Sequence, residues 1–330
     1  LTLTSRGWRA IKSPYLLPKS FAITNESSVP DITQGWASQT SMCAYKLIWD
    51  DLLGGGMSEV LIIEEIPCEN GDGVIAKVTI NRPDKLNSLN NEVRTKLKEM
   101  CDWADSNDSV RCVVIAGAGP NPPQEGKRAK PNAFVAGADI TEFVGKGSEE
   151  IKEIFTDNAI EAIWDLSKPT ISMVDGFALG GGCEVACACD IRIASTRAIF
   201  GTPEIKLGLI PGYGGTQRLV HLVGYGKAME MMMTGNNFDA EEAYRLGIVN
   251  QIYSSEDLES KTMEMAQNIA SKSMHTLRVA KVAIRAALDN GITKGVEFEA
   301  EVFAKLFDSE DQKIGVQAFI DRTKPEWKHR

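Results

Sequence analysis

The chain of 330 residues has few of the side chains from which metal centres and disulfide frameworks are built. It has three histidines, which leave little room for a His-based metal cluster. Its seven cysteines are odd in number and scattered, without a paired CxxC spacing, so they fit reduced thiols in a cytosol-like compartment. No apolar run approaches the roughly 18 residues that cross a bilayer. We therefore expect no metal and no membrane partner.

The sequence also lacks a surplus of positive charge. Its 36 Lys and Arg residues face 45 Asp and Glu residues, which gives a formal net charge of −9. Binding to nucleic acid of any base sequence needs a strongly cationic protein surface, so nucleic acid is not an expected partner. With 43% hydrophobic residues the composition is that of an ordinary globular protein, and the length suits one large domain or two modest ones.

The first 56 residues show no sustained helical or strand period. They begin with Leu1 and end in Gly54-Gly55-Gly56, directly before Met57. Three glycine codons before a methionine codon resemble a translated ribosome-binding site, so we expect Met57 to be the true start and residues 1–56 to be a disordered or wrongly included extension. The alternative is a transit peptide, because residues 1–25 contain basic and hydroxyl side chains and no acid. The first hypothesis predicts a cytoplasmic protein, the second a protein of the mitochondrial matrix.

From residue 57 onward, strand and helix patterns alternate and then give way to helices. Residues 58–66 and 74–80 flank Asn70-Gly71-Asp72-Gly73, which is typical of a β-hairpin. Further strands are predicted at 111–116, 170–174 and 190–194, and helices at 90–105, 226–234, 239–246, 256–273, 275–289 and 294–307. Residues 117–132 form a long Gly/Pro-rich loop. The pattern predicts an α/β core over residues 57–255 and a C-terminal helical subdomain over residues 256–330.

Glycine-rich segments that follow predicted strands are the first sign of chemistry. The segment Phe134-Val135-Ala136-Gly137-Ala138-Asp139-Ile140 ends a strand in small residues whose amides are free to face a ligand, although, taken alone, it is better explained as a tight turn. Farther along, Gly180-Gly181-Gly182 opens a helix that carries Glu184 in its first turn. Amides at a helix N-terminus hold developing negative charge. No Lys-Ser/Thr pair follows the glycines and they are not spaced G-x-G-x-x-G, so this is neither a P-loop nor a dinucleotide fingerprint.

A second glutamate lies on an irregular segment. Glu204 stands in Phe200-Gly201-Thr202-Pro203-Glu204, which cannot be a regular helix interior because of its proline. Taken alone, Glu184 is explained as a structural residue of a helix N-terminus. Two glutamates together with two amide-lined turns favour proton transfer by carboxyl groups beside an oxyanion.

At these motifs the chain resembles the crotonase (enoyl-CoA hydratase/isomerase) superfamily, and within it the hydratases. The resemblance runs from about Val60 to Lys328 and is strongest from Lys168 to Arg218, with a further motif at residues 81–89. It implies a crotonase-like spiral of repeated β-β-α units with a C-terminal helical subdomain. It also implies an enoyl-CoA hydratase, which adds water reversibly across the 2,3-double bond of a 2-enoyl-CoA to give a 3-hydroxyacyl-CoA. Coenzyme A is then part of the substrate, and no separate cofactor is expected.

The resemblance assigns roles to individual residues. Ala138 and Gly181 match the two backbone amides of the oxyanion hole, and Glu184 and Glu204 match the paired glutamates of the hydratases. The remaining matches are expected to bind the coenzyme A or acyl part of the substrate or to lie near it: Lys85 and Leu86 at the adenosine end, Ala136, Gly137, Asp139 and Ile140 beside the oxyanion amide, Gly212 near the water, and Phe303 and Phe319 around coenzyme A, the last normally from a neighbouring subunit.

Other functions remain as alternatives. Enoyl-CoA isomerases, decarboxylases and cyclic dienoyl-CoA hydratases share the same oxyanion hole, and both glutamates favour hydration over reactions that use one acid. A Clp-type serine protease needs a Ser–His–Asp set, for which no elbow motif or suitable histidine is visible. The predicted helices beyond residue 256 carry more apolar surface than one face needs. The resemblance independently implies a homotrimer or homohexamer.

Overall fold

The computed structural model describes residues 60–123, 126, 128–156 and 158–330. The predictions for residues 1–56 lie outside this part of the chain. The larger sheet has the order β1-β2-β3-β5-β7-β10. Its strands are β1 (Leu61–Pro67), β2 (Val74–Ile80), β3 (Val110–Gly117), β5 (Thr170–Val174), β7 (Ile191–Ser195) and β10 (Gln251–Tyr253). The predicted hairpin is confirmed, because β1 pairs antiparallel with β2, whereas all other pairs in this sheet are parallel.

The second sheet is shorter and has the order β4-β6-β8-β9. Its strands are β4 (Ala133–Val135), β6 (Phe177–Leu179), β8 (Ile199–Gly201) and β9 (Phe238–Asp239). The chain passes from a strand of the larger sheet to one of the smaller sheet and then into helices, as in β3-β4, β5-β6 and β7-β8. The repeated β-β-α units of the sequence prediction are therefore confirmed.

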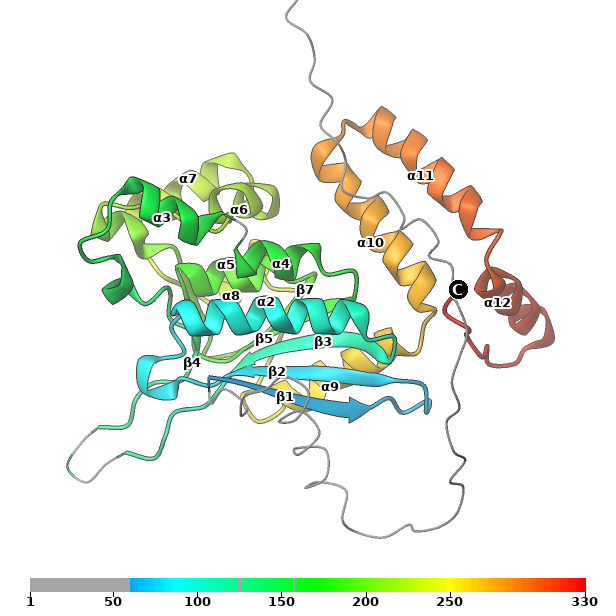
Figure 1. The fold of residues 1–330 in the computed structure, drawn as a ribbon, viewed down its shortest axis with the longest axis horizontal. Coiled ribbons are helices and arrows are strands. Elements are labelled where there is room, and N and C mark those ends of the chain that lie inside the picture. The colour runs from blue at the N-terminus through cyan, green and yellow to red at the C-terminus, as the bar shows by residue number, and fades with distance from the viewer. Residues whose placement is uncertain (1–59, 124–125, 127, 157) are drawn as a thin grey trace, which may run out of the picture. The chain divides into compact units, whose positions relative to one another are not determined.

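Among the described residues, seven α-helices lie between β2 and β10 in the order of the chain. They are α2 (Asn91–Ser106), α3 (Ser148–Phe155), α4 (Ala159–Asp165), α5 (Gly181–Ala188), α6 (Gly215–Val223), α7 (Tyr225–Thr234) and α8 (Ala240–Arg245). The side chain of Asn90 caps α2 by accepting a hydrogen bond from the Val93 amide at 3.0 Å. Every residue of α5 is buried, so this helix lies inside the core between the sheets and the other helices (Figure 1).

The C-terminal helices divide into one that packs on the larger sheet and three that extend from it (Figure 1). In α9 (Leu258–Ala270), Leu258, Ala266 and Ala270 pack against buried residues of β2, β3 and β5. The helices α10 (Met274–Asp289), α11 (Ile292–Leu306) and α12 (Glu310–Asp321) follow. The division of the chain at residue 256 stays a prediction, and the packing of α9 favours a later boundary.

The sequence pattern was wrong about two short strands. Residues beyond about 215 were expected to be almost wholly helical, but β9 and β10 lie among them. Strands of two and three residues are too short to show a period of two, and their pairing with β8 and β7 fixes them instead. Within the described residues no helix is long and apolar enough to cross a membrane.

Candidate active site

Glu184 lies in the first turn of α5, buried at 2% exposure. Its Oε1 atom accepts hydrogen bonds from the backbone amides of Tyr213 at 2.7 Å and of Gly215 at 2.8 Å. Both donors belong to the loop between Pro211 and the start of α6, and the fit is close: a Cβ atom on Gly215 would lie 2.9 Å from Oε1. The loop therefore fixes one carboxylate oxygen of Glu184 and leaves the other for chemistry.

The turn before α5 needs its glycines. Gly180 has φ +52, where L side chains are strained, and a Cβ atom there would lie 3.0 Å from Oε1 of Glu204. A Cβ atom on Gly182 would overlap the carbonyl oxygen of Val135 and lie 2.7 Å from its carbonyl carbon. Gly181 begins α5, so its N–H has no partner within the helix. The three glycines therefore let a helix N-terminus approach the end of β4 and the segment of Glu204.

Ala138 lies beside this helix N-terminus. A Cβ atom on Gly181 would be 3.5 Å from the Ala138 nitrogen. A bridge to Leu89 orients Ala138, because the Leu89 amide donates to Gly137 oxygen and Leu89 oxygen accepts from the Asp139 amide, both at 2.9 Å. In such a bridge the N–H of Ala138 points away from Leu89. The predicted pair of amides, from Ala138 and Gly181, is thus brought together.

Glu204 follows Pro203 in the short 3-10 helix η3 (Pro203–Leu207). Its Oε1 lies beside Gly180, and its buried Oε2 atom has no hydrogen-bond partner among the described residues. Burial raises the pKa of Glu204 above the usual range of a glutamate. All four residues predicted to be catalytic are therefore neighbours, although they come from three different segments of the chain, of which α5 supplies both Gly181 and Glu184.

Burial also sets the protonation of the other glutamate. Desolvation raises the pKa of Glu184 to about 7, and the negative charge of Glu204 acts in the same direction. The amides of Gly215 and Tyr213 and the guanidinium of Arg218 act against it. A carboxyl with a pKa near neutrality can both accept and release a proton under ordinary conditions, which suits general acid–base catalysis.

The residues predicted near the oxyanion amide form one connected segment. Ala136 donates its amide to the carbonyl oxygen of Leu86 at 3.0 Å, which ties the predicted coenzyme A loop to the end of β4. Gly137 has φ +104, and Asp139 forms an ion pair with Arg82 at 3.1 Å. Ile140 is 51% exposed, and Lys85 is exposed at the end of the 3-10 helix η1 (Pro83–Lys85). The segment of Lys85 and Leu86 is thus joined by a backbone hydrogen bond to the segment that leads to Ala138.

Gly212 and the two predicted phenylalanines differ in their placement. Gly212 directly precedes Tyr213, and a Cβ atom there would lie 2.5 Å from the ring of Phe155. Phe303 on α11 is 60% exposed and Phe319 on α12 is 85% exposed. Both helices lie apart from α5 in Figure 1. The structure of one chain therefore brings Gly212 to the glutamates but not Phe303 or Phe319.

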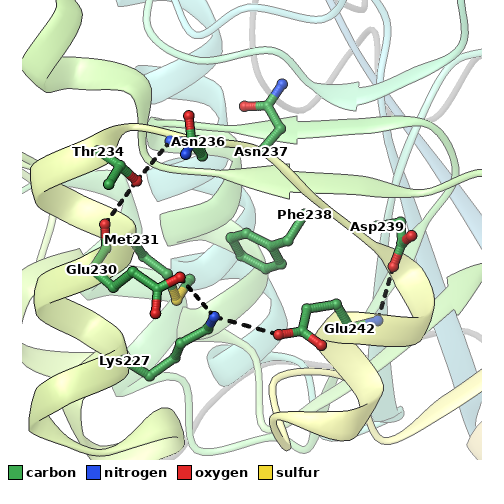
Figure 2. Close-up of a pocket in the computed structure, with 9 residues that line it drawn as sticks. All are labelled: Lys227, Glu230, Met231, Thr234, Asn236, Asn237, Phe238, Asp239 and Glu242. Atoms are coloured by element: carbon green, nitrogen blue, oxygen red, sulfur yellow. Dashed lines mark hydrogen bonds and ion pairs between the residues drawn. The ribbon is translucent and has the colours of Figure 1, made fainter.

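A separate surface pocket of about 360 Å³ lies between α7 and α8, away from these residues. Figure 2 shows Lys227 between Glu230 and Glu242, with Nζ–O distances of 3.0 and 3.4 Å. The lysine charge is already matched by carboxylates, and none of the residues predicted to be catalytic lines this pocket. The convergence of the glutamates and amides, and not this pocket, defines the candidate active site.

Sequence reasoning marked Gly212 but missed that the loop from Pro211 to Arg218 holds Glu184. The Tyr213 and Gly215 amides and the Arg218 side chain all contact Glu184 or its loop. The only signal was the run of glycines around Tyr213, which indicates a close backbone approach without saying to what.

Comparison with known proteins decides the family. A family model for enoyl-CoA hydratase/isomerase matches residues 70–330. The chain belongs to this family. It is 39% identical over 257 residues to the short-chain-enoyl-CoA hydratase of Clostridium acetobutylicum, which covers 77% of this chain and 94% of the relative. It is 36% identical over 252 residues to the crotonyl-CoA hydratase of Syntrophomonas wolfei, which covers 76% of this chain and 93% of that relative.

Solved structures of the enoyl-CoA hydratase/isomerase family share the fold. An enoyl-CoA hydratase from Bacillus anthracis has a TM-score of 0.74 at 32% identity, and the match covers 82% of this chain and 100% of the Bacillus chain. An enoyl-CoA hydratase from Geobacillus kaustophilus has a TM-score of 0.71 at 35% identity and covers 83% of this chain and 100% of its own. The crotonase fold predicted from the sequence is confirmed.

Proposed function

We propose that this protein is an enoyl-CoA hydratase in which Glu184, Glu204 and the amides of Ala138 and Gly181 carry the reaction. The observation that supports this most is the convergence of the buried carboxyl of Glu184, the half-buried carboxyl of Glu204 and the amides of Ala138 and Gly181 at the N-terminus of α5. The curated relatives named as hydratases support the same reaction. The substrate is a 2-enoyl-CoA thioester, and coenzyme A enters as part of it without a separate cofactor.

The two amides stabilise the charge that the reaction creates. Addition of water at C3 of a conjugated thioester moves an electron pair onto the thioester oxygen, which becomes an enolate. Amides placed about 3 Å from that oxygen stabilise the transition state, and losing one such donor costs on the order of 100-fold in rate. Ala138 and Gly181 supply these donors from two segments that meet at the end of β4.

The two glutamates move the protons. Glu184, ionised, removes a proton from water while the water oxygen bonds to C3. Glu204, protonated, then gives a proton to C2 as the enolate collapses. Burial raises the pKa of Glu204, which favours its neutral form, and the pKa of Glu184 near 7 supports its role as a base at neutral pH. A proton that passes from Glu184 to Glu204 through solvent restores both groups.

The direct test is hydration of crotonyl-CoA. We expect the absorbance of the conjugated thioester to fall and the product to be heavier by one water molecule. A 3-enoyl-CoA, supplied in parallel, tests the isomerase alternative. If the protein converts the 3-enoyl-CoA and leaves crotonyl-CoA unhydrated, the fold stands and the proposed reaction is wrong.

We further propose that the chain acts as a homotrimer or homohexamer. Exposed apolar side chains on the last three helices support this: Val282, Ile284, Leu288, Ile292, Val296, Phe303, Val316, Phe319 and Ile320. In this arrangement Phe303 lies beside the coenzyme A together with Phe319 of a neighbouring subunit. Light scattering on the purified protein tests the assembly, and a monomer would overturn it. The compartment, cytoplasm or mitochondrial matrix, stays a prediction that depends on residues 1–56.

A further inference from the structure

Arg218, on the first turns of α6, contacts the loop that holds Glu184. Its side chain is 9% exposed, and its Nη1 atom donates a hydrogen bond to the carbonyl oxygen of Tyr213 at 2.8 Å. The amide of the same Tyr213 donates to Oε1 of Glu184. Tyr213 is therefore held at both ends of its backbone, by the carboxylate on one side and by the guanidinium on the other.

The guanidinium is itself fixed from two further directions. Its Nη2 atom donates to Oε1 of Glu161 on α4 at 2.7 Å, and its carbon lies 4.7 Å from the centre of the Trp164 ring. An arginine fork that binds a carboxylate and stacks on an aromatic ring has little freedom to move. A Cβ atom on Gly214 would collide with Nη1, so the loop also packs directly against the arginine.

We propose that Arg218 is a positioning residue for Glu184: it anchors the Tyr213–Gly215 loop to α4 and thereby fixes the position of the carboxylate. This rests on the role proposed above for Glu184. Geometry carries the argument, because both hydrogen bonds that fix Glu184 come from a loop whose carbonyl at residue 213 is bound by Arg218.

The charge of Arg218 has a separate effect. A nearby guanidinium favours the ionised carboxylate, and so it works against the burial that raises the pKa of Glu184. The other titratable groups that face Glu184 are Glu204, Tyr213, Cys183 and Cys187. None of them needs to be changed to test Arg218.

Two substitutions separate the contacts of Arg218 from its charge. In Arg218→Gln both are lost, so we expect kcat for crotonyl-CoA to fall about 10- to 100-fold, as small displacements of a catalytic group do. We also expect the acid limb of kcat/KM against pH to move up by about 0.5 to 1 unit. In Arg218→Lys the charge stays but the fork is lost, so kcat falls while the acid limb stays in place. KM changes little in both, because the thioester contacts remain.

Arg245→Gln is the matched control. It removes an arginine paired with a glutamate, Glu242, on α8, and it leaves the candidate site untouched. We expect its kcat and pH profile to equal those of the wild type. If Arg218→Gln folds and keeps both its kcat and its acid limb, the proposal is overturned. If that variant does not fold, Arg218→Lys decides, and an unchanged kcat there overturns the anchoring.

An activity-independent readout keeps this test apart from the test of the hydratase function. The carboxyl infrared band that disappears in Glu184→Gln reports the titration of Glu184 without turnover. We expect that band to titrate at higher pH in Arg218→Gln and at unchanged pH in Arg218→Lys. If the wild type does not hydrate crotonyl-CoA, the proposed function fails, yet the infrared titration still supports or overturns the positioning by Arg218.

Discussion

Alanine substitutions at two neighbouring glycines, Gly181 and Gly182, are expected to affect different properties: Gly182→Ala lowers stability, and Gly181→Ala lowers activity. A methyl group on Gly182 would overlap the carbonyl oxygen of Val135, which belongs to the backbone of β4 and cannot rotate away. Overpacking in a dense core costs about 1–3 kcal/mol, and a backbone clash falls at the upper end of that range. The strand and the helix must separate, so Gly182→Ala should be clearly less stable than the wild type.

A methyl group on Gly181 meets one tight contact, with a flexible side chain, and two ordinary ones. It would lie 3.3 Å from Cδ1 of Leu89, 3.5 Å from the Ala138 nitrogen and 3.6 Å from the ring of Tyr213. Leu89 can shift by a few tenths of an ångström, and alanine is favoured over glycine in a helix by about 1 kcal/mol. Gly181→Ala should therefore fold with a stability within about 1 kcal/mol of the wild type. The methyl group would lie 3.5 Å from the Ala138 nitrogen, where the proposed oxyanion hole places the thioester oxygen.

The assay combines thermal unfolding with crotonyl-CoA hydration. For Gly182→Ala we expect a loss of about 3 kcal/mol or more, which lowers Tm by at least about 5 °C for a chain of this size. For Gly181→Ala we expect a near-normal Tm and a loss of on the order of 100-fold in kcat/KM, as when one oxyanion donor is removed. Gly226→Ala is the control, since nothing lies within 4 Å of that site. A folded Gly181→Ala enzyme with at least half the wild-type activity would refute the placement of the oxyanion hole.

Two further predictions concern pH and the segment beside Ala138. The pKa of Glu184, raised by burial to about 7, predicts that kcat/KM falls as pH drops through 7. The same shift means that folding favours the neutral carboxyl, so its stabilisation is complete below the unfolded pKa of 4.5 and is lost as pH rises through 7. Glu184→Gln should then be more stable than the wild type at about pH 8, by up to about 3 kcal/mol. If chemical denaturation shows no gain in stability at that pH, the raised pKa of the buried carboxyl is wrong. Asn87 is fully buried at φ +57 and donates to the carbonyls of Ala118 and Ala133 at 2.9 and 2.7 Å. Asn87→Ala leaves both carbonyls without these hydrogen bonds and puts alanine at a positive φ, so the free energy of unfolding in urea should fall by about 2–4 kcal/mol. A fall below about 1 kcal/mol would show that the segment does not depend on this side chain.

The sequence predicted the elements that have a long enough pattern. The hairpin of β1 and β2, the helix α2 and the opening of α5 at Gly181 were all indicated by alternation, spacing and turn residues. β10, at three residues, escaped because pairing with β7, and not local pattern, determines it. Such short-range patterns do not predict which residues far apart in the sequence come into contact.

The same limit applies to the candidate site. Glu184 and Glu204 were predicted, since each stands beside glycines at a position that the family resemblance marks. The contact of Arg218 with Glu161 joins segments 57 residues apart and left no trace in local composition, and its contact with Tyr213, five residues away, depends on the loop conformation. Phe303 and Phe319 show the opposite case. The resemblance marks them, but the place proposed for them beside coenzyme A depends on a proposed assembly that one chain does not contain.

The most direct test of the central claim compares the wild type with Glu184→Gln and Glu204→Gln in the hydration of crotonyl-CoA. The account predicts that each variant folds, binds the thioester and loses at least about 100-fold in kcat, because each substitution removes a proton-transfer group. If either folded variant hydrates crotonyl-CoA within tenfold of the wild type, that glutamate does not carry a proton in the reaction and the two-carboxyl mechanism is wrong.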